Sequence, residues 1–117
     1  MIPAPVKRTI PFELLQQVDI RVGTIVAVDE LPKSKKLVRL HVDFGDHQRM
    51  ILAGLKQERE TPAELIGRQT LFVVNLEPKA AMGELSEGML LDLGFADGIL
   101  PVLAVPEAPV PNGTRAG

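Results

Sequence analysis

Apolar and polar residues alternate along much of this chain, a pattern typical of strands with one buried face. In the first such stretch, Val18, Ile20 and Val22 share one face, and Gly23 interrupts the run, which indicates a bulge or a bend. Pro101 in the last stretch indicates an edge position. The pattern predicts strands over residues 18–28, 38–44, 49–53, 70–76, 88–94 and 99–105.

Helical signals are confined to two short segments. Residues 12–17 can form one or two turns, with Phe12 and Leu15 on one face. Residues 61–64 carry a capping-box pattern with proline at the first helical position, and Gly67 ends it. Residues 1–11 are expected to form an N-terminal arm rich in proline. Residues 31–36 are expected to form a loop, and residues 75–91 a longer loop.

Three strands, a short helix and two more strands is the element order of an OB-fold. We therefore expect an all-β protein, a five-stranded Greek-key barrel with a short helix between strands 3 and 4 and a C-terminal strand extension. An SH3-like barrel is the nearest alternative. Since 117 residues leave no room for a second ordinary domain, the chain is expected to be an arm (1–11) and one domain (12–117).

Composition narrows the class of protein. The formal net charge is -2, but residues 1–59 hold ten Lys and Arg against seven Asp and Glu, while residues 60–117 hold three against eight. A local basic patch is therefore expected in the first half. No apolar run approaches the ~18 residues of a membrane span, and the first residues lack the apolar run of a signal peptide. We expect a cytoplasmic protein that does not enter a membrane.

Chemistry-bearing residues are too scattered for an active site. The chain has no cysteine, and neither His41 nor His47 is spaced to form a triad with Ser34 or Ser86. Metal-ligand spacings and phosphate-binding glycine loops are missing from the sequence. We expect no enzymatic activity, no cofactor and no metal.

Aromatic residues are also scarce, with four Phe and neither Trp nor Tyr. Phe44 and Phe72 lie in apolar strand patterns that predict burial. Single-stranded nucleic acids usually stack on exposed aromatic rings, so this mode of binding is not expected.

A cluster of lysines is the first positive feature. Lys33, Lys35 and Lys36 fall within one predicted loop, and Arg21 and Arg39 lie on the polar faces of the strands on either side. Clustered ammonium groups can neutralise phosphates and release their counterions. A solvated surface loop can have the same composition, so the cluster alone does not decide between the two.

The block of residues 75–91 is the second feature, because oligonucleotides commonly bind OB-folds beside the loop between strands four and five. Asn75, Lys79 and Ser86 could donate hydrogen bonds to a phosphate or a base edge. Met89 either makes apolar contacts with a ligand or belongs to the core.

Eight segments extend the picture to most of the chain. They are residues 19–25 (DIRVGTI), 36–37 (KL), 42–45 (VDFG), 53–55 (AGL), 61–67 (TPAELIG), 74–79 (VNLEPK), 86–91 (SEGMLL) and 110–114 (VPNGT). In this order they resemble the stand-alone tRNA-binding domain family. Its relatives are the C-terminal domain of bacterial methionyl-tRNA synthetase, the endothelial-monocyte-activating polypeptide II domain and the CsaA secretion chaperone. The resemblance runs from about residue 12 to the C-terminus.

The resemblance implies an OB-fold with an added C-terminal piece, and a homodimer made through the N-terminal segment and that piece. It also implies recognition of tRNA by shape and backbone charge, with contacts after the first strand and around strands four and five. The matching residues are Lys36, Asn75, Lys79, Ser86 and Met89, and charge alone adds Lys33 and Lys35.

Departures from the family pattern leave alternatives open. The family loop His-Pro-Asn-Ala-Asp-Lys-Leu reads LPKSKKL at residues 31–37, which loses a histidine and gains a lysine where the family has an acid. Around Lys79, in contrast, Glu77, Ala80 and Met82 stand where basic residues are common. The first hypothesis is a dimeric tRNA-binding protein. The second is a CsaA-like chaperone for unfolded or export-bound client proteins, and the third an accessory domain of an aminoacyl-tRNA synthetase.

Overall fold

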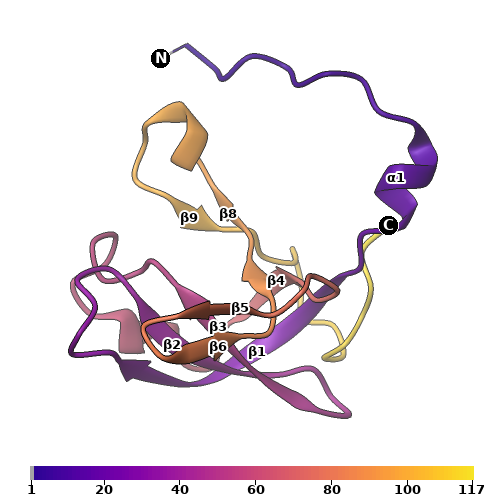
Figure 1. Cartoon of the computed structure of the whole chain (residues 1–117). Helices are drawn as coiled ribbons and strands as arrows, with labels where there is room; N and C mark the ends of the chain where they lie inside the picture. The colour runs from indigo at the N-terminus through magenta and orange to yellow at the C-terminus, as the bar shows by residue number, and fades with distance from the viewer. Residues whose placement is uncertain (1) are drawn as a thin grey trace.

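The computed structural model describes residues 2–117, and most of their regular secondary structure is β-strand (Figure 1). Five strands form a curled antiparallel sheet in the order β3-β2-β1-β4-β7, and two further pairs are the β5–β6 and β8–β9 hairpins. The helices are α1 (Phe12–Gln16) and the 3-10 turns η1 (Pro62–Leu65) and η2 (Phe95–Asp97). The strands are β1 Ile20–Glu30, β2 Val38–Asp43, β3 Gln48–Ala53, β4 Gln69–Val73, β5 Lys79–Ala81, β6 Glu84–Ser86, β7 Met89–Leu90, β8 Asp92–Leu93 and β9 Val102–Leu103.

Strand β1 is long enough to serve both halves of the curled sheet. It pairs with β4 through its first residues and with β2 through its later ones, and the register shifts at Val26. The irregularity expected at Gly23 therefore lies three residues later. Gly23 meets a different need, since a Cβ atom there would lie 2.6 Å from Val42 Cγ1 and 2.9 Å from the Phe44 ring. The core fits against bare backbone at this point.

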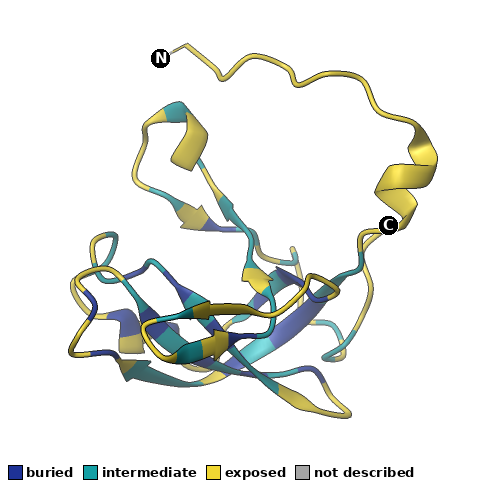
Figure 2. Ribbon diagram, viewed as in Figure 1, coloured by how far each residue is buried: buried dark blue, intermediate teal, exposed yellow. Residues whose placement is uncertain are grey.

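The core fills the inside of the curl. On β2, buried and partly exposed residues alternate without exception, as the sequence pattern predicts. Phe44 and Phe72 are buried, as expected, and meet edge to face with ring centroids 5.5 Å apart. Figure 2 shows buried residues concentrated in the sheet, while the arm and α1 are exposed throughout.

Side chains help to close the barrel where β3 meets the segment before β7. The amide of Met50 donates to Glu87 Oε1 (3.1 Å), and the amide of Leu52 donates to Ser86 Oγ (3.0 Å). Only the Glu87 amide, which donates to the Met50 carbonyl (2.9 Å), makes an ordinary backbone bond here. Side-chain oxygens thus satisfy edge amides of β3 that a longer partner strand would otherwise pair.

The C-terminal half departs most from expectation. Residues 75–91, predicted as a loop, contain the β5–β6 hairpin, whose turn residues Met82 and Gly83 both have positive φ, 55° and 77°. Two such residues in succession favour a tight hairpin turn. The single strand predicted over 88–94 is divided, because β7 stays in the main sheet while β8 leaves it to pair with β9.

Two smaller expectations also need correction. The turn after β3 is the 3-10 helix η1, and Thr61 makes no capping hydrogen bond with its side chain. Glu64, the expected partner in the capping box, instead accepts from Arg59 Nη1 at 2.9 Å. The C-terminal extension is confirmed as an ordered strap along β1, where the amide of Val22 donates to the Thr114 carbonyl at 2.9 Å.

The N-terminal segments lie apart from the barrel. Residues 2–11 form no helix or strand, and α1, predicted from the sequence, has no buried residue. Between residues 2 and 117, no helix is long and apolar enough to cross a membrane.

Candidate nucleic-acid interface

Residues 31–37, the basic loop, have a defined shape because Ser34 lies at their centre. Its amide donates to the Leu31 carbonyl (3.0 Å), and its hydroxyl accepts from the amide of Leu37 (2.9 Å). Leu31 and Ser34 are buried, so the loop turns inward at these two positions. The lysines between and after them point outward and are exposed.

A fourth lysine, Lys56, stabilises the basic loop through hydrogen bonds to its backbone. Lys56 Nζ donates to the carbonyls of Leu31 (2.6 Å) and Ser34 (2.9 Å), and its amide donates to the Lys36 carbonyl (3.1 Å). The ammonium group thus stabilises loop backbone and is not offered to a ligand. Sequence reasoning missed Lys56, because a lone lysine after a strand carries no signal of such a role.

Arg49 on β3 does the same for residues 74–88. Its Nη1 donates to the carbonyls of Val74 and Glu87 (3.1 Å to the latter), one at each end of this segment. Its Nε donates to His47 Nε2 at 3.0 Å, and the guanidinium lies 6.0 Å from the centre of the Phe44 ring. One side chain therefore ties both ends of the segment that carries the β5–β6 hairpin to the sheet.

A cavity of about 770 Å³ opens between the basic loop and the β5–β6 hairpin. Four of the seven residues predicted to bind tRNA line it, Lys36, Lys79, Ser86 and Met89. The other lining residues are Leu37, Leu52, Leu76, Glu77, Ala81 and Gly88. The structure thus brings together two parts of the chain that the sequence analysis treated separately.

The three other predicted residues lie outside this lining. Lys33 and Lys35 are exposed on the basic loop. Asn75 lies beside the start of β1, where its Oδ1 accepts from the amide of Asp19 (2.8 Å) and its Nδ2 donates to the Gln17 carbonyl (2.6 Å). Asn75 therefore connects the segment 74–88 to the residues that follow α1.

The hydroxyl of Ser86 is also engaged, since it accepts from Leu52 and donates to the Gly88 carbonyl at 3.0 Å. Met89 is 46% exposed, so it is available at the cavity wall and is not a core residue.

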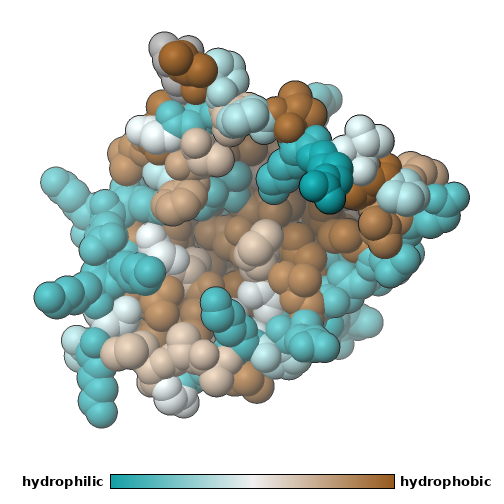
Figure 3. All heavy atoms as spheres, turned by 45° about the horizontal axis from the view of Figure 1, so that its top comes forward, coloured by the Kyte–Doolittle hydropathy of each residue, from teal (hydrophilic) through white to brown (hydrophobic). Residues whose placement is uncertain are grey.

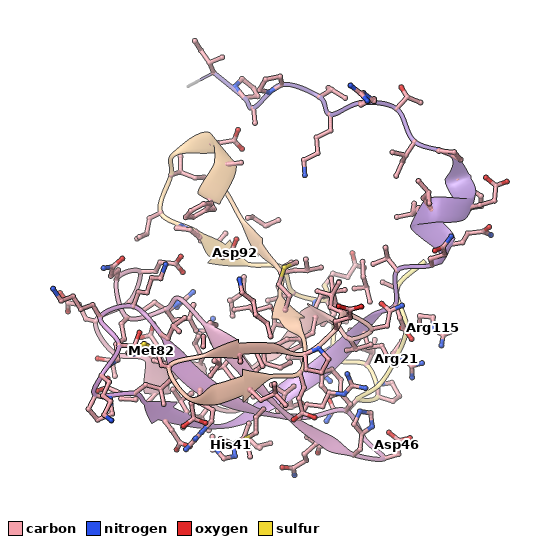
Figure 4. The ribbon with its side chains drawn as sticks, viewed as in Figure 1. Arg21, His41, Asp46, Met82, Asp92 and Arg115 are labelled. Atoms are coloured by element: carbon pink, nitrogen blue, oxygen red, sulfur yellow. The ribbon has the colours of Figure 1, made fainter. Side chains whose placement is uncertain are left out.

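The interface differs from the other polar faces in whether its cationic side chains form ion pairs. Arg39 donates to Asp29 and to Glu84 Oε2, each at 2.9 Å, and Arg21 pairs with Asp19 at 3.0 Å. The hydrogen bond from Arg21 holds the pKa of Asp19 below its ordinary value. Figure 4 shows Arg21 close to Arg115, which donates to the same carboxylate. Within residues 2–117, in contrast, none of the six lysines makes an ion pair, and four of them, Lys33, Lys35, Lys36 and Lys79, lie at this interface.

The part of the chain that the structure describes contains no group of three or more His, Cys, Asp or Glu side chains placed to hold a metal ion. His41 and His47 each face a carboxylate, Asp29 at 2.6 Å and Asp46 at 2.7 Å. The His47 ring donates from Nδ1 and accepts at Nε2, which satisfies both nitrogens of the neutral imidazole.

A curled five-stranded sheet with a cavity between the β1–β2 loop and the segment that joins β4 to β7 is the architecture of OB-type binding modules. The chain belongs to the tRNA-binding domain family, because the family model described as "Putative tRNA binding domain" matches residues 20–115. The expected family and fold are thereby confirmed.

Similar proteins come from both branches of this family. The methionine–tRNA ligase of Porphyromonas gingivalis is 40% identical over 112 residues, which are 96% of this chain and 16% of the ligase. The chain thus spans about a sixth of the length of this curated relative.

Two solved structures cover nearly all of the chain. A MetRS related protein from Pyrococcus horikoshii has 32% identity and a TM-score of 0.85, over 95% of this chain and 100% of its own. The chaperone CsaA from Bacillus anthracis has 33% identity and a TM-score of 0.79, over 94% of this chain and 100% of its own.

Proposed function

We propose that this chain is a non-catalytic tRNA-binding protein that recognises tRNA by shape and backbone charge. The observation that carries the proposal is the set of lysines without ion pairs on two fastened segments, with Lys36 and Lys79 in the lining of one cavity and Lys33 and Lys35 exposed beside it on the basic loop. Contacts to phosphates fix the orientation of an RNA without reading its sequence. Because the proposed ligand is tRNA, we expect the protein to act in the cytoplasm. Asn75 and Ser86 contribute by positioning the backbone, and Met89 by apolar contact.

We propose further that the protein acts as a homodimer joined through the arm, α1 and the β8–β9 hairpin. Phe12, Phe95 and Leu100 are 66%, 76% and 67% exposed on these elements. Figure 3, which turns the top of Figure 1 forward, shows hydrophobic groups gathered around a hollow on this side. Exposed apolar surface of this kind is typical of an interaction site. A dimer doubles the set of lysines and gains avidity.

Salt dependence tests the charge mechanism. With about three phosphate contacts from each subunit, log K against log salt should have a slope of roughly −5, at about −0.9 per contact. We would measure fluorescence anisotropy of labelled bulk tRNA at about 50 and 200 mM salt, where this slope weakens binding by about a thousandfold.

The variants are a triple substitution to alanine at Lys33, Lys35 and Lys36, and a control that removes two exposed cations outside both the arm and the interface, Arg68 and Arg115. The first should lose affinity and flatten the slope, while the control should keep both. If the wild type does not bind tRNA at low salt, the proposal is wrong.

The exposed apolar side chains and the similarity to CsaA favour a second candidate, a chaperone that binds unfolded or export-bound proteins. Such binding should be insensitive to moderate salt and should suppress thermal aggregation of a model client at stoichiometric dimer. No suppression at tenfold excess would count against it. The similarity to methionine–tRNA ligases supports an accessory role beside a synthetase as a third candidate.

A further inference from the structure

The cavity between the basic loop and the β5–β6 hairpin has a shape and a charge pattern that suit a particular part of an RNA. We propose that it takes up one unpaired nucleotide, with the base inside and the flanking phosphates on Lys36 and Lys79. The proposal rests on the proposed function and specifies what the site binds within the RNA.

The size and lining of the cavity support this occupant. At about 770 Å³ it lies in the range of pockets that enclose small ligands, and a single nucleotide is such a ligand. Its walls are mainly aliphatic, with Leu37, Leu52 and Leu76 from three separate segments. Apolar walls suit the two faces of a base, which are the part of an RNA that is least favourably solvated.

No aromatic ring lines this cavity. Phe44 and Phe72 are in the core, while Phe12 and Phe95 are exposed on α1 and η2, outside its lining. An open stacking surface for successive bases is therefore missing from this site. Enclosure of a single base between Leu76 and Met89, which are 49% and 46% exposed, is the arrangement that the lining allows.

The charges of the lining distinguish an RNA from an apolar peptide. Lys36 belongs to the basic loop and Lys79 to β5, so ammonium groups come from two elements that border the same cavity. Phosphates on either side of an inserted base would neutralise both of them. An apolar peptide side chain could fill the same space but would leave the two lysines without partners.

Glu77 is the one carboxylate among the lining residues. An ionised carboxylate can only accept hydrogen bonds. It therefore favours a base that carries an amino group, so adenine or cytosine should bind better than uracil. The walls need little reorganisation to bind, because Lys56 and Arg49 already fasten the segments that form them.

The test compares two hairpin RNAs that differ at one position, a single bulged adenosine in one and an abasic ribose in the other. The chain of residues 1–117 should bind the first about tenfold more tightly, a difference that corresponds to the contacts of one base. Both RNAs should show the same salt slope, because the phosphates are the same. A bulged uridine should fall between the two.

Adjacent residues of β5 supply the variant and its control. Ala81 lines the cavity, while Ala80 is exposed, lies opposite Leu85 in the hairpin and does not line it. Ala81→Leu should narrow the cavity without adding a stacking surface and reduce the preference for the bulged adenosine to about onefold, whereas Ala80→Leu should retain the tenfold preference. Leu76→Ser removes one exposed wall and should lower the preference even if Ala81→Leu does not fold.

The outcomes separate the cavity from the function. Equal, salt-dependent binding of both hairpins by the wild type would overturn the nucleotide site and leave the tRNA-binding proposal standing. A leucine-rich peptide that competes with the bulged RNA in the wild type and loses affinity in Ala81→Leu, with no base preference, would assign the cavity to peptides. Failure to bind tRNA and both hairpins would overturn both proposals.

Discussion

The two sides of this molecule differ in how far contacts within one chain pair the polar groups and cover the apolar side chains. On the side of the candidate interface, Lys56 and Arg49 direct their charges at backbone carbonyls and hold two segments in fixed positions. On the other side, the arm is connected to the β8–β9 hairpin through the amide of Ala4, which donates to Asp97 Oδ1 at 2.6 Å. Large apolar side chains there remain exposed, Phe95 and Leu100 most of all in the hairpin.

The difference indicates two kinds of task. A segment fastened by partly buried hydrogen bonds presents its side chains at little entropic cost, as a ligand site requires. Exposed apolar surface of this kind is typical of an interaction site, and a partner that covers it stabilises the fold. The interface side is therefore held in place by contacts within one chain, whereas we propose that a second chain covers the arm and the β8–β9 hairpin.

The largest expected effect tests the proposed dimer contact of the arm and the β8–β9 hairpin. The double variant Phe95→Asp/Leu100→Asp should shift the protein to monomer, because a charge would be buried at each central position of the proposed dimer. The loss is expected to exceed about 3 kcal/mol, more than a hundredfold in the dimer dissociation constant. Sedimentation equilibrium measures it. Val26→Asp, at a 40% exposed apolar residue on β1, is the control and should leave the dimer intact.

The second prediction concerns the interface side. Arg49→Met should lower the free energy of unfolding by about 2–3 kcal/mol, because two carbonyls lose a charged donor. Amide hydrogen exchange should accelerate over residues 76–86 more than in the rest of the sheet. Arg68→Met, at an exposed position, should change stability by less than about 0.5 kcal/mol. A uniform acceleration over the whole sheet would show that Arg49 does not act locally.

Sequence patterns could predict the sheet best where one face of a strand is buried and the other is partly exposed, as in β2. The alternation at Val38, Leu40 and Val42 is confirmed residue by residue, since a period of two has a direct physical cause. The break between β7 and β8 could not be predicted, because residues 88–94 are apolar for two different partners. The β5–β6 hairpin was missed for another reason, since its turn places Met82, not glycine, at a φ of 55°.

The candidate site was predictable in its exposed members but not in its supports. A cluster of lysines is visible in the local composition of the sequence. Lys56 and Arg49, in contrast, act on the carbonyls of Leu31 and Val74, each 25 residues away in the sequence. The function of Asn75 is of the same kind. Its side chain forms hydrogen bonds with the backbone of Gln17 and Asp19, which are 58 and 56 residues away in the sequence. No local sequence pattern encodes such contacts.

The third prediction separates support from contact. Lys56→Met should lower the free energy of unfolding by about 1–2 kcal/mol and weaken tRNA binding at every salt concentration, with the slope of log K unchanged. Lys36→Met should instead flatten the slope by about 0.9 per subunit, because it removes a phosphate contact. Anisotropy titrations at several salt concentrations measure both. If Lys56→Met also flattens the slope, its ammonium group contacts RNA directly.

The smallest effect is expected where charges are exposed. On the polar face of β1 and β2, Asp29 accepts hydrogen bonds from His41 Nε2 (2.6 Å) and Arg39 (2.9 Å). These bonds, that from His41 first, hold the pKa of Asp29 below its ordinary value. Because folding lowers this pKa, its contribution to stability is fully present above the ordinary value and is lost as the pH falls through the folded one.

Urea unfolding of the wild type and Asp29→Asn at several pH values between about 6 and 2 measures this contribution. The midpoint of the wild type should fall toward low pH, and the fall should be shallower in the variant, because asparagine has no proton to gain. Glu107→Gln removes an exposed carboxylate that has no ion pair within residues 2–117, and should retain the wild-type profile. Parallel profiles for wild type and Asp29→Asn would mean that this polar face, unlike the interface side, adds nothing to the stability of the fold. A shallower profile would instead show that the ion pairs of Asp29 with Arg39 and His41 stabilise the folded sheet.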